Sequence, residues 1–170
     1  ISSDVCPEIR EYERFTTTVV NSYIKPLIST YLKKLDTELR HKGFNCPLLL
    51  MTSGGTLTNV ISACNNPVRL VESGPAGGAI LATSIAEDLK LDKVISFDMG
   101  GTTAKITIIE NQKAIKAREF EVDRKARFKK GSGLPLRIPV IEMVEIGAGG
   151  GSIARVNKLD QIITGPDSAG

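Results

Sequence analysis

The sequence predicts an α/β protein in which helices cover a mixed β-sheet. Two observations lead to this prediction: apolar residues recur at helical spacing in 16–42 and 79–89, and β-type segments follow one another from residue 93 onward. A sheet buries its apolar side against helices, so this order is typical of a layered α/β domain. At 170 residues the chain is long enough for one ordinary domain with a hydrophobic core.

The segment 16–42 is expected to form a long helix. Its apolar residues, from Val19 to Leu39, recur at the spacing that places them on one helix face. Gly43 follows as a natural helix-ending residue, and Pro26 is expected to kink the helix.

Shorter elements are expected to connect this helix to the second half of the chain. They are a buried strand at 48–52, a turn at 53–55, a short helix at 57–64, a short strand at 69–72 and an apolar helix through 79–89. Ser73 is suited to cap the last helix, and Pro75 is suited to its first turn.

The second half is expected to be mostly β-structure. The expected elements are strands at 93–98, 104–110 and 113–121 in a meander with a turn at 110–112, a basic loop at 124–137, a segment at 138–144, and a closing hairpin formed by 152–156 and 161–164.

The turn between the first two of these strands is the most informative feature. Asp98 ends one apolar run, and Gly100, Gly101, Thr102 and Thr103 lead to the next. Glycines lack the Cβ atoms that would keep backbone N–H groups away from an oxyanion, and threonine hydroxyls add donors. An aspartate at the strand end can hold Mg²⁺ directly or through water. The pattern predicts a phosphate-binding hairpin; the alternative is an ordinary Gly-Gly turn with a surface aspartate.

A second glycine-rich segment lies at 145–154. Four of the five positions from 147 to 151 are glycine, which disfavours the interior of a helix or a strand. The segment therefore suits a loop that is pressed against a flat ligand or against another backbone.

Other common kinds of site are not supported. The cysteines at 6, 46 and 64 form no C-x-x-C pair, and the single histidine, His41, cannot make a two-histidine metal site. The basic run at 124–130 is a candidate nucleic-acid patch, but the net charge of +3 favours a solvated loop or one over an anionic ligand. No apolar run approaches the ~20 residues that span a bilayer. We therefore expect a cytoplasmic chain with no nucleic-acid or membrane partner.

The order of three motifs resembles the ATP-dependent hydantoinase/5-oxoprolinase family of the hydantoinase A type. The motifs are Glu-Ser-Gly-Pro-Ala at 72–76, Phe-Asp-Met-Gly-Gly-Thr at 97–102 and Ile-Gly-Ala-Gly-Gly-Gly-Ser-Ile-Ala at 146–154. Further segments that look like landmarks of this family lie at 8–14, Tyr23, Pro26, Tyr31, 53–55 and 165–170.

The resemblance implies part of an actin-like (ribonuclease H-like) ATPase lobe, a fold in which two lobes hold ATP between them. Residues 71–89 would be the connecting helix, 97–105 the second phosphate hairpin and 145–154 a glycine loop beside the nucleotide. The chain would then be a single partial domain of a longer protein. It would have a helical and connecting part at 1–92 and a phosphate-binding part at 93–170, and it would be inactive in isolation.

The activity implied by the resemblance is ATP-dependent hydrolysis of a five-membered cyclic amide, such as hydantoin, N-methylhydantoin or 5-oxoproline, through a phosphorylated amide. Similar chains are ATP-dependent carboxylase subunits of the acetone or acetophenone type, and a non-catalytic assembly domain is a third hypothesis. The implied cofactors are ATP and Mg²⁺. The implied partners are the substrate, the remainder of the chain and a hydantoinase B-type subunit.

The resemblance also implies residue roles. Asp98 would be the catalytic and metal-binding carboxylate, and the turn residues Gly100, Gly101, Thr102 and Thr103 would bind phosphate. The residues expected beside the nucleotide or the substrate are Gly147, Gly149, Gly150, Gly151 and Ser152. Relatives often carry aspartate where this chain has Lys105, and a lysine can reach a phosphate but cannot bind Mg²⁺.

Overall fold

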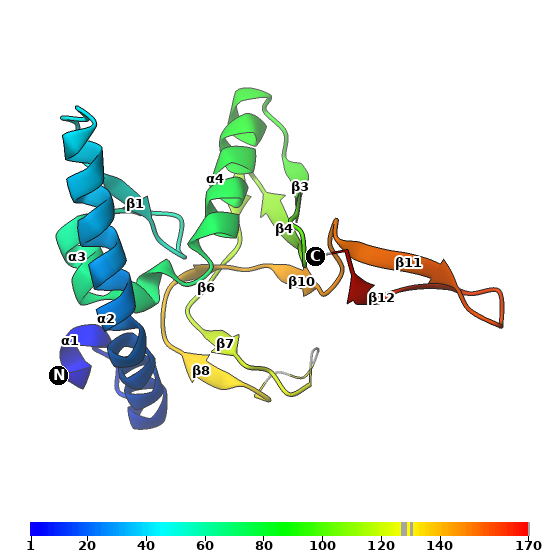
Figure 1. The fold of residues 1–170 in the computed structure, drawn as a ribbon, viewed down its shortest axis with the longest axis horizontal. Coiled ribbons are helices and arrows are strands. Elements are labelled where there is room, and N and C mark those ends of the chain that lie inside the picture. Colours follow the sequence, from blue (N-terminus) through cyan, green and yellow to red (C-terminus); the bar gives the residue numbers. More distant parts are fainter. Residues whose placement is uncertain (127–128, 130, 170) are drawn as a thin grey trace. The chain divides into compact units, whose positions relative to one another are not determined.

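The computed structural model describes residues 1–126, 129 and 131–169 (Figure 1). The chain forms two compact units, each built from two stretches: Ile1–Gly77 with Lys116–Ile141, and Gly78–Ile115 with Glu142–Gly170. Helices and strands combine in both units, which confirms the α/β class. Every strand pair of the described residues is antiparallel. The division at residue 92 follows the order of motifs along the chain and stays a prediction.

The first unit is built around the long helix α2 (Glu11–His41). The other elements of this unit are α1 (Ser2–Val5), β1 (Leu49–Met51), β2 (Leu57–Asn59), α3 (Val60–Asn65), the 3₁₀ helix η1 (Pro67–Leu70), β6 (Lys116–Ala117), β7 (Phe120–Val122), β8 (Leu134–Leu136) and β9 (Val140–Ile141). Strand β1 pairs with β2, β6 with β9, and β7 with β8. Val68 of η1 and Leu136 of β8 belong to one buried cluster, and Leu32 of α2 belongs to another.

Helix α2 confirms the expected long helix, although it begins at Glu11 rather than at residue 16. Pro26 lies inside the helix, and the Thr30 hydroxyl donates to its carbonyl oxygen at 2.9 Å. The single apolar face expected from the spacing is wrong in part, because Leu32 is 3% exposed whereas Tyr23 is 85% exposed. The apolar residues therefore form two stripes, of which one packs on the core.

Three expectations for residues 48–72 are corrected by the structure. Strand β1 is not fully buried, since Leu49 is 52% exposed. The expected helix at 57–64 begins only at Val60, because residues 57–59 pair with β1 as strand β2. The expected strand at 69–72 is replaced by η1, in which the fixed φ of Pro67 suits the first turn of a helix.

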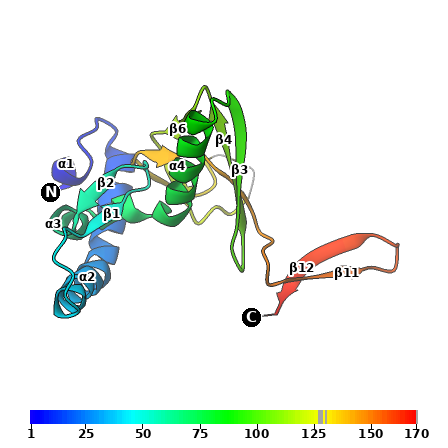
Figure 2. The ribbon, with the colours of Figure 1, turned by 90° about the horizontal axis from the view of Figure 1, so that it is seen from above.

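The second unit contains most of helix α4 (Ser73–Asp88). Its strands are β3 (Lys93–Met99), β4 (Ala104–Glu110), β5 (Lys113–Ala114), β10 (Val144–Ile146), β11 (Ser152–Val156) and β12 (Ile162–Ser168). Strands β3 and β4 lie beside the helix, and the hairpin of β11 and β12 lies away from it (Figures 1 and 2). One sheet has the order β10-β4-β3, with β5 also paired to β4, and β11 pairs with β12. Ser73 begins α4 rather than capping it, because the first helical hydrogen bond runs from the Ala76 N–H to the Glu72 carbonyl oxygen at 3.2 Å, while Pro75 lies in the first turn as expected.

The expected meander is correct for its first two strands and for the start of the third, which pairs with β4 as β5 after the expected turn at 110–112. The segment 113–121 is divided into β5, β6 and β7, which pair with β4, β9 and β8 respectively. The expected loop at 124–137 contains β8, and the residues 127, 128 and 130 of the basic run lie outside the described part of the chain. The closing hairpin is confirmed as β11–β12, with Asn157 accepting a hydrogen bond from the Leu159 N–H at its tight end.

Among the described residues, no helix combines the length and apolar character needed to cross a membrane.

Candidate functional site

The hairpin of β3 and β4 positions the candidate phosphate-binding turn. Its two strands pair without interruption from Lys93–Glu110 to Met99–Ala104. The turn is closed by the Gly100 N–H, which donates to the Thr103 carbonyl oxygen at 2.9 Å. The alternation of apolar and polar residues on either side of two glycines therefore specifies the predicted hairpin.

The tip of this turn presents backbone donors that have no partner among the described residues. Within the described part of the chain, the N–H groups of Gly101, Thr102 and Thr103 donate no hydrogen bond. A Cβ placed on Gly101 would have no atom within 4 Å, so the space beside this residue is open. Consecutive free N–H groups beside an open glycine suit an anion such as a phosphate.

The glycine loop at 147–151 lies directly against the backbone of this turn. The Gly150 N–H donates to the Gly100 carbonyl oxygen at 2.9 Å, and the Gly151 N–H donates to the Gly101 carbonyl oxygen at 2.8 Å. A Cβ on Gly149 would lie 2.7 Å from the carbonyl oxygens of both turn glycines. Of the two alternatives for the loop, contact with another backbone is the one that the structure shows for these three glycines.

Ser152 holds the loop in this shape. Its hydroxyl oxygen accepts from the Gly149 N–H at 3.0 Å, and its own N–H donates to the Gly149 carbonyl oxygen at 3.0 Å. The Gly151 carbonyl oxygen accepts from the Ala169 N–H at 2.7 Å, which ties the loop to the end of β12. The expected place of Gly147, the three neighbouring glycines and Ser152 beside a nucleotide or substrate stays a prediction.

Asp98 lies on β3 next to the turn, and its side chain is exposed. It is paired in register with Lys105 of β4, which is in turn paired with Glu145 of β10. A Cβ on Gly78 of α4 would lie 3.8 Å from Asp98 Oδ2, an ordinary van der Waals distance that places this carboxylate beside the helix. The Glu145 partner of Lys105 was missed by the sequence analysis, because only the register of β10 against β4 brings the two residues together.

The residues of the turn fit a nucleotide with magnesium better than a metal bound by protein alone. Among the described residues, no group of three or more His, Cys, Asp or Glu side chains is placed to hold a metal ion. Mg²⁺ is commonly held by one or two carboxylates together with phosphate oxygens and water. The open glycine at the turn, the N–H groups without a partner among the described residues and the exposed carboxylate of Asp98 match that arrangement.

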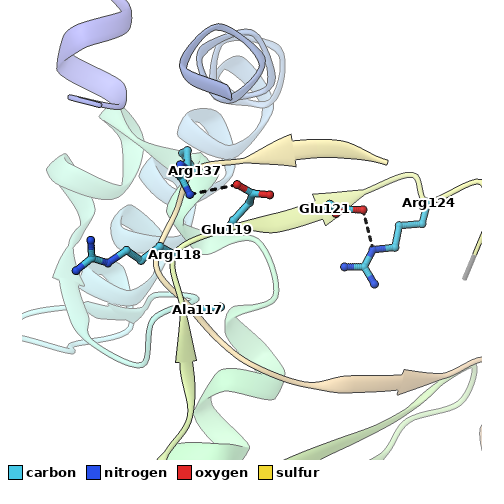
Figure 3. Close-up of a pocket in the computed structure, with 6 residues that line it drawn as sticks. All are labelled: Ala117, Arg118, Glu119, Glu121, Arg124 and Arg137. Atoms are coloured by element: carbon cyan, nitrogen blue, oxygen red, sulfur yellow. Dashed lines mark hydrogen bonds and ion pairs between the residues drawn. The ribbon is translucent and has the colours of Figure 1, made fainter. Parts of the chain in front are cut away.

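A pocket in the first unit is the main competing site (Figure 3). It has a volume of about 200 Å³ and is lined by Ala117, Arg118, Glu119, Glu121, Arg124 and Arg137. Most of its charged groups are paired within the protein: Arg137 Nη1 lies 3.1 Å from Glu119 Oε2, and Arg124 Nε lies 3.2 Å from Glu121 Oε2. The Gly131 N–H donates to Glu121 at 2.7 Å, and this hydrogen bond lowers the pKa of the carboxyl group. These pairs leave little unbalanced charge for a ligand.

Comparisons with known proteins add to this geometry. The sequence model of the hydantoinase/oxoprolinase family matches residues 14–170. An uncharacterised protein of Methanocaldococcus jannaschii is 45% identical over 172 residues, and the caprolactamase subunit alpha of Pseudomonas jessenii is 32% identical over 167 residues. These alignments cover 99% and 98% of this chain.

Two solved structures are also similar. An acetone carboxylase in its nucleotide-free form has a TM-score of 0.78 at 26% identity, and the ATP-dependent caprolactamase of Pseudomonas jessenii has a TM-score of 0.73 at 32% identity. Each similarity covers 99% of this chain but only 22% or 23% of the solved chain. The chain likewise spans 25% and 23% of the two curated relatives, so it corresponds to about a quarter of such proteins.

Proposed function

Because the chain belongs to the hydantoinase/oxoprolinase family, we propose that it supplies the phosphate-binding hairpin of an ATP-dependent enzyme that opens a cyclic amide. The single observation that supports this proposal most is the turn of the β3–β4 hairpin. Its unused N–H groups, its open glycine and the adjacent carboxylate of Asp98 form a cradle for a phosphate with a metal ion.

Each group of the turn has a distinct part in the proposed reaction. The N–H groups of Gly101, Thr102 and Thr103 receive phosphate oxygens, and the threonine hydroxyls are further donors to them. Asp98 would hold Mg²⁺ directly or through its water shell, and thus fix the orientation of the phosphates. Phosphoryl transfer asks the protein mainly for such positioning and for stabilisation of negative charge.

The proposed chemistry is activation of the amide followed by hydrolysis. ATP supplies a phosphoryl group: the amide oxygen bonds to the terminal phosphorus as the bond to ADP breaks. With its oxygen phosphorylated, the amide has a carbon that is a better electrophile than the carbon of the amide itself. Water adds to that carbon, and the carbon–nitrogen bond of the ring breaks to give an amine and an acyl phosphate. A second water then hydrolyses the acyl phosphate to a carboxylate and phosphate.

Five-membered rings are the proposed substrates: hydantoin, N-methylhydantoin or 5-oxoproline. Proteins named 5-oxoprolinase, from Dictyostelium discoideum and from Saccharomyces cerevisiae, are 28% and 29% identical to this chain, which supports this choice. The name caprolactamase of another relative adds caprolactam to the ring amides to be tested.

A second candidate function is ATP-dependent carboxylation of a ketone. It is favoured by one observation, the TM-score of 0.78 with acetone carboxylase, which is no lower than the score with caprolactamase. The two activities would use the same phosphate-binding hairpin, so this segment alone does not separate them. The third hypothesis, a non-catalytic assembly domain, gives Asp98 no role in turnover.

We also propose a second subunit as a partner. Several relatives are named as subunits, namely caprolactamase subunit alpha, acetone carboxylase beta subunit and acetophenone carboxylase gamma subunit. A hydantoinase B-type chain is the partner that we expect, and it should co-purify with the complete gene product.

The test is ADP release by the complete gene product, with any subunit that co-purifies, in the presence of Mg-ATP. The compounds to compare are 5-oxoproline, hydantoin, N-methylhydantoin, caprolactam, and acetone with bicarbonate. A cyclic amide that stimulates ADP release and opens in step with it would support the proposal. If acetone alone stimulates release, the carboxylase function replaces it.

The variant Asp98→Asn tests the proposed catalytic residue. It removes the carboxylate charge at nearly constant shape, and we expect turnover to fall by more than about tenfold, or roughly 1.4 kcal/mol of barrier. Asp92→Asn, an exposed change just before the same strand, is the matched control and should leave turnover intact. Wild-type turnover in Asp98→Asn would remove Asp98 from the mechanism and favour the assembly domain.

A further inference from the structure

Three charged residues form a row across the sheet, one position away from the turn. Asp98 of β3 pairs in register with Lys105 of β4, and Lys105 pairs in register with Glu145 of β10. Residues opposite each other on neighbouring strands project to the same face of a sheet. The row therefore places a lysine between two carboxylates on the face that carries Asp98.

Lys105 forms an ion pair with Glu145, and the lysine is the more buried of the two side chains. Its side chain is 15% exposed, whereas the Glu145 side chain is 53% exposed. Its Nζ lies 3.8 Å from Glu145 Oε1. This distance is too long for a hydrogen bond, so the attraction between the two groups is Coulombic. A contact of this length with an exposed carboxylate is a weak one.

The other lysines of this hairpin lie at its opposite end. Lys93 and Lys113 are both paired in register with Glu110, the last residue of β4. Lys105, by contrast, is separated from the turn at 100–103 only by Ala104. It is therefore the lysine of the β3–β4–β5 segment that stands beside the candidate phosphate cradle.

We propose that Lys105 binds the terminal phosphate of ATP, and that Glu145 holds the lysine beside the turn until ATP arrives. The inference rests on the proposed function, because it requires a nucleotide at the turn. A triphosphate carries more negative charge than a single carboxylate. The lysine ammonium group has three N–H donors on a flexible stem, so it can turn from one anion to the other. The lysine also offsets the repulsion between Asp98 and the incoming phosphates.

A purely structural lysine would behave differently. If Lys105 served only to balance Asp98 and Glu145, removing its charge would affect folding and would weaken ATP and ADP binding alike. A ligand of the terminal phosphate instead distinguishes ATP from ADP. It should also bind ATP better when its competitor Glu145 loses its charge.

The test is the dissociation constants of ATP and ADP, measured by calorimetry at fixed Mg²⁺ on the complete gene product. For Lys105→Met we expect ATP binding to weaken by about tenfold or more, the worth of one charged hydrogen bond, and ADP binding to change by less than about threefold. For Glu145→Gln we expect ATP binding to tighten by roughly two- to fivefold, since exposed ion pairs are weak competitors. Lys113→Met, at the far end of the hairpin, is the matched control and should bind both nucleotides as the wild type does.

The outcomes separate this inference from the proposed function. If the wild type binds ATP and Lys105→Met binds it equally well, the inference is wrong while the proposed function stands. Equal losses of ATP and ADP affinity in Lys105→Met, or weaker ATP binding by Glu145→Gln, would also overturn it. The second variant decides the question if Lys105→Met fails to fold. A wild-type protein that binds no ATP contradicts the proposed function and this inference together.

Discussion

Two glycine-rich segments of the second unit are used in opposite ways. The turn at 100–103 has three N–H groups that donate no hydrogen bond within the described residues, and a Cβ on Gly101 would meet no atom. In the loop at 147–151, the N–H groups of Gly150 and Gly151 donate hydrogen bonds to carbonyl oxygens of the turn. The absence of a side chain at Gly101 leaves open space beside the turn. The absence of a side chain at Gly149 lets the loop approach the backbone of the turn closely.

This difference shows that glycine content alone does not identify a ligand site. Both segments combine glycine with hydroxyl residues, and both are typical of phosphate-binding loops. The two segments differ in whether their backbone N–H groups already have acceptors within the protein. Donors that are already satisfied support a neighbour, and donors that remain unsatisfied next to open space can bind an anion.

The largest effect is expected for Gly149→Ala. Its Cβ would lie 2.7 Å from three backbone atoms of Gly100 and Gly101, a separation that requires the loop to move away from the turn. We expect the free energy of local opening to fall by about 3 kcal/mol, as in severe overpacking. Hydrogen exchange of the Gly150 and Gly151 amides in the complete gene product would measure it. Unchanged protection of these two amides would show that the loop does not rest on the turn.

A smaller effect is expected for Gly151→Ala. Its Cβ would lie 3.0 Å from the Gly101 carbonyl oxygen and 3.0 Å from Ser168 Oγ, and these contacts are less severe than those at Gly149. We expect the same opening free energy to fall by about 1 kcal/mol, near the lower end of overpacking costs. The double variant Gly151→Ala with Ser168→Ala should recover part of that loss in the same exchange measurement. A loss as large as that of Gly149→Ala would mean that the loop is held more rigidly than these distances imply.

The sequence predicts the elements of this unit better than it predicts their contacts. Alternating residues on both sides of Gly100 and Gly101 are sufficient to predict the β3–β4 hairpin, because its two strands are close in the chain. The third strand is predicted correctly only at its start, β5, because the pairing of β6 with β9 and of β7 with β8 depends on residues further along the chain.

The candidate site shows the same limit. Asp98 and the turn residues are found from a local motif, and the structure keeps them together. The contact of the glycine loop with the turn joins residues some fifty positions apart, and the motif leaves open whether a ligand or a backbone fills the space. The ion pair of Lys105 and Glu145 needs the register of β10, which no local pattern specifies.

The smallest effect on folding is expected for Gly101→Ala, and this variant tests the comparison most directly. A Cβ at this position has no atom within 4 Å and the residue does not have a left-handed backbone, so the opening free energy should change by less than about 1 kcal/mol. The added methyl group would nevertheless stand beside the free N–H groups, and we expect ATP to bind about tenfold more weakly, the worth of roughly one hydrogen bond to a charged group. Calorimetry with ATP and hydrogen exchange on the same sample separate the two effects. Normal ATP binding together with normal folding would show that the open space at Gly101 is not the place of the phosphate, and the free donors of the turn would then lose their proposed ligand.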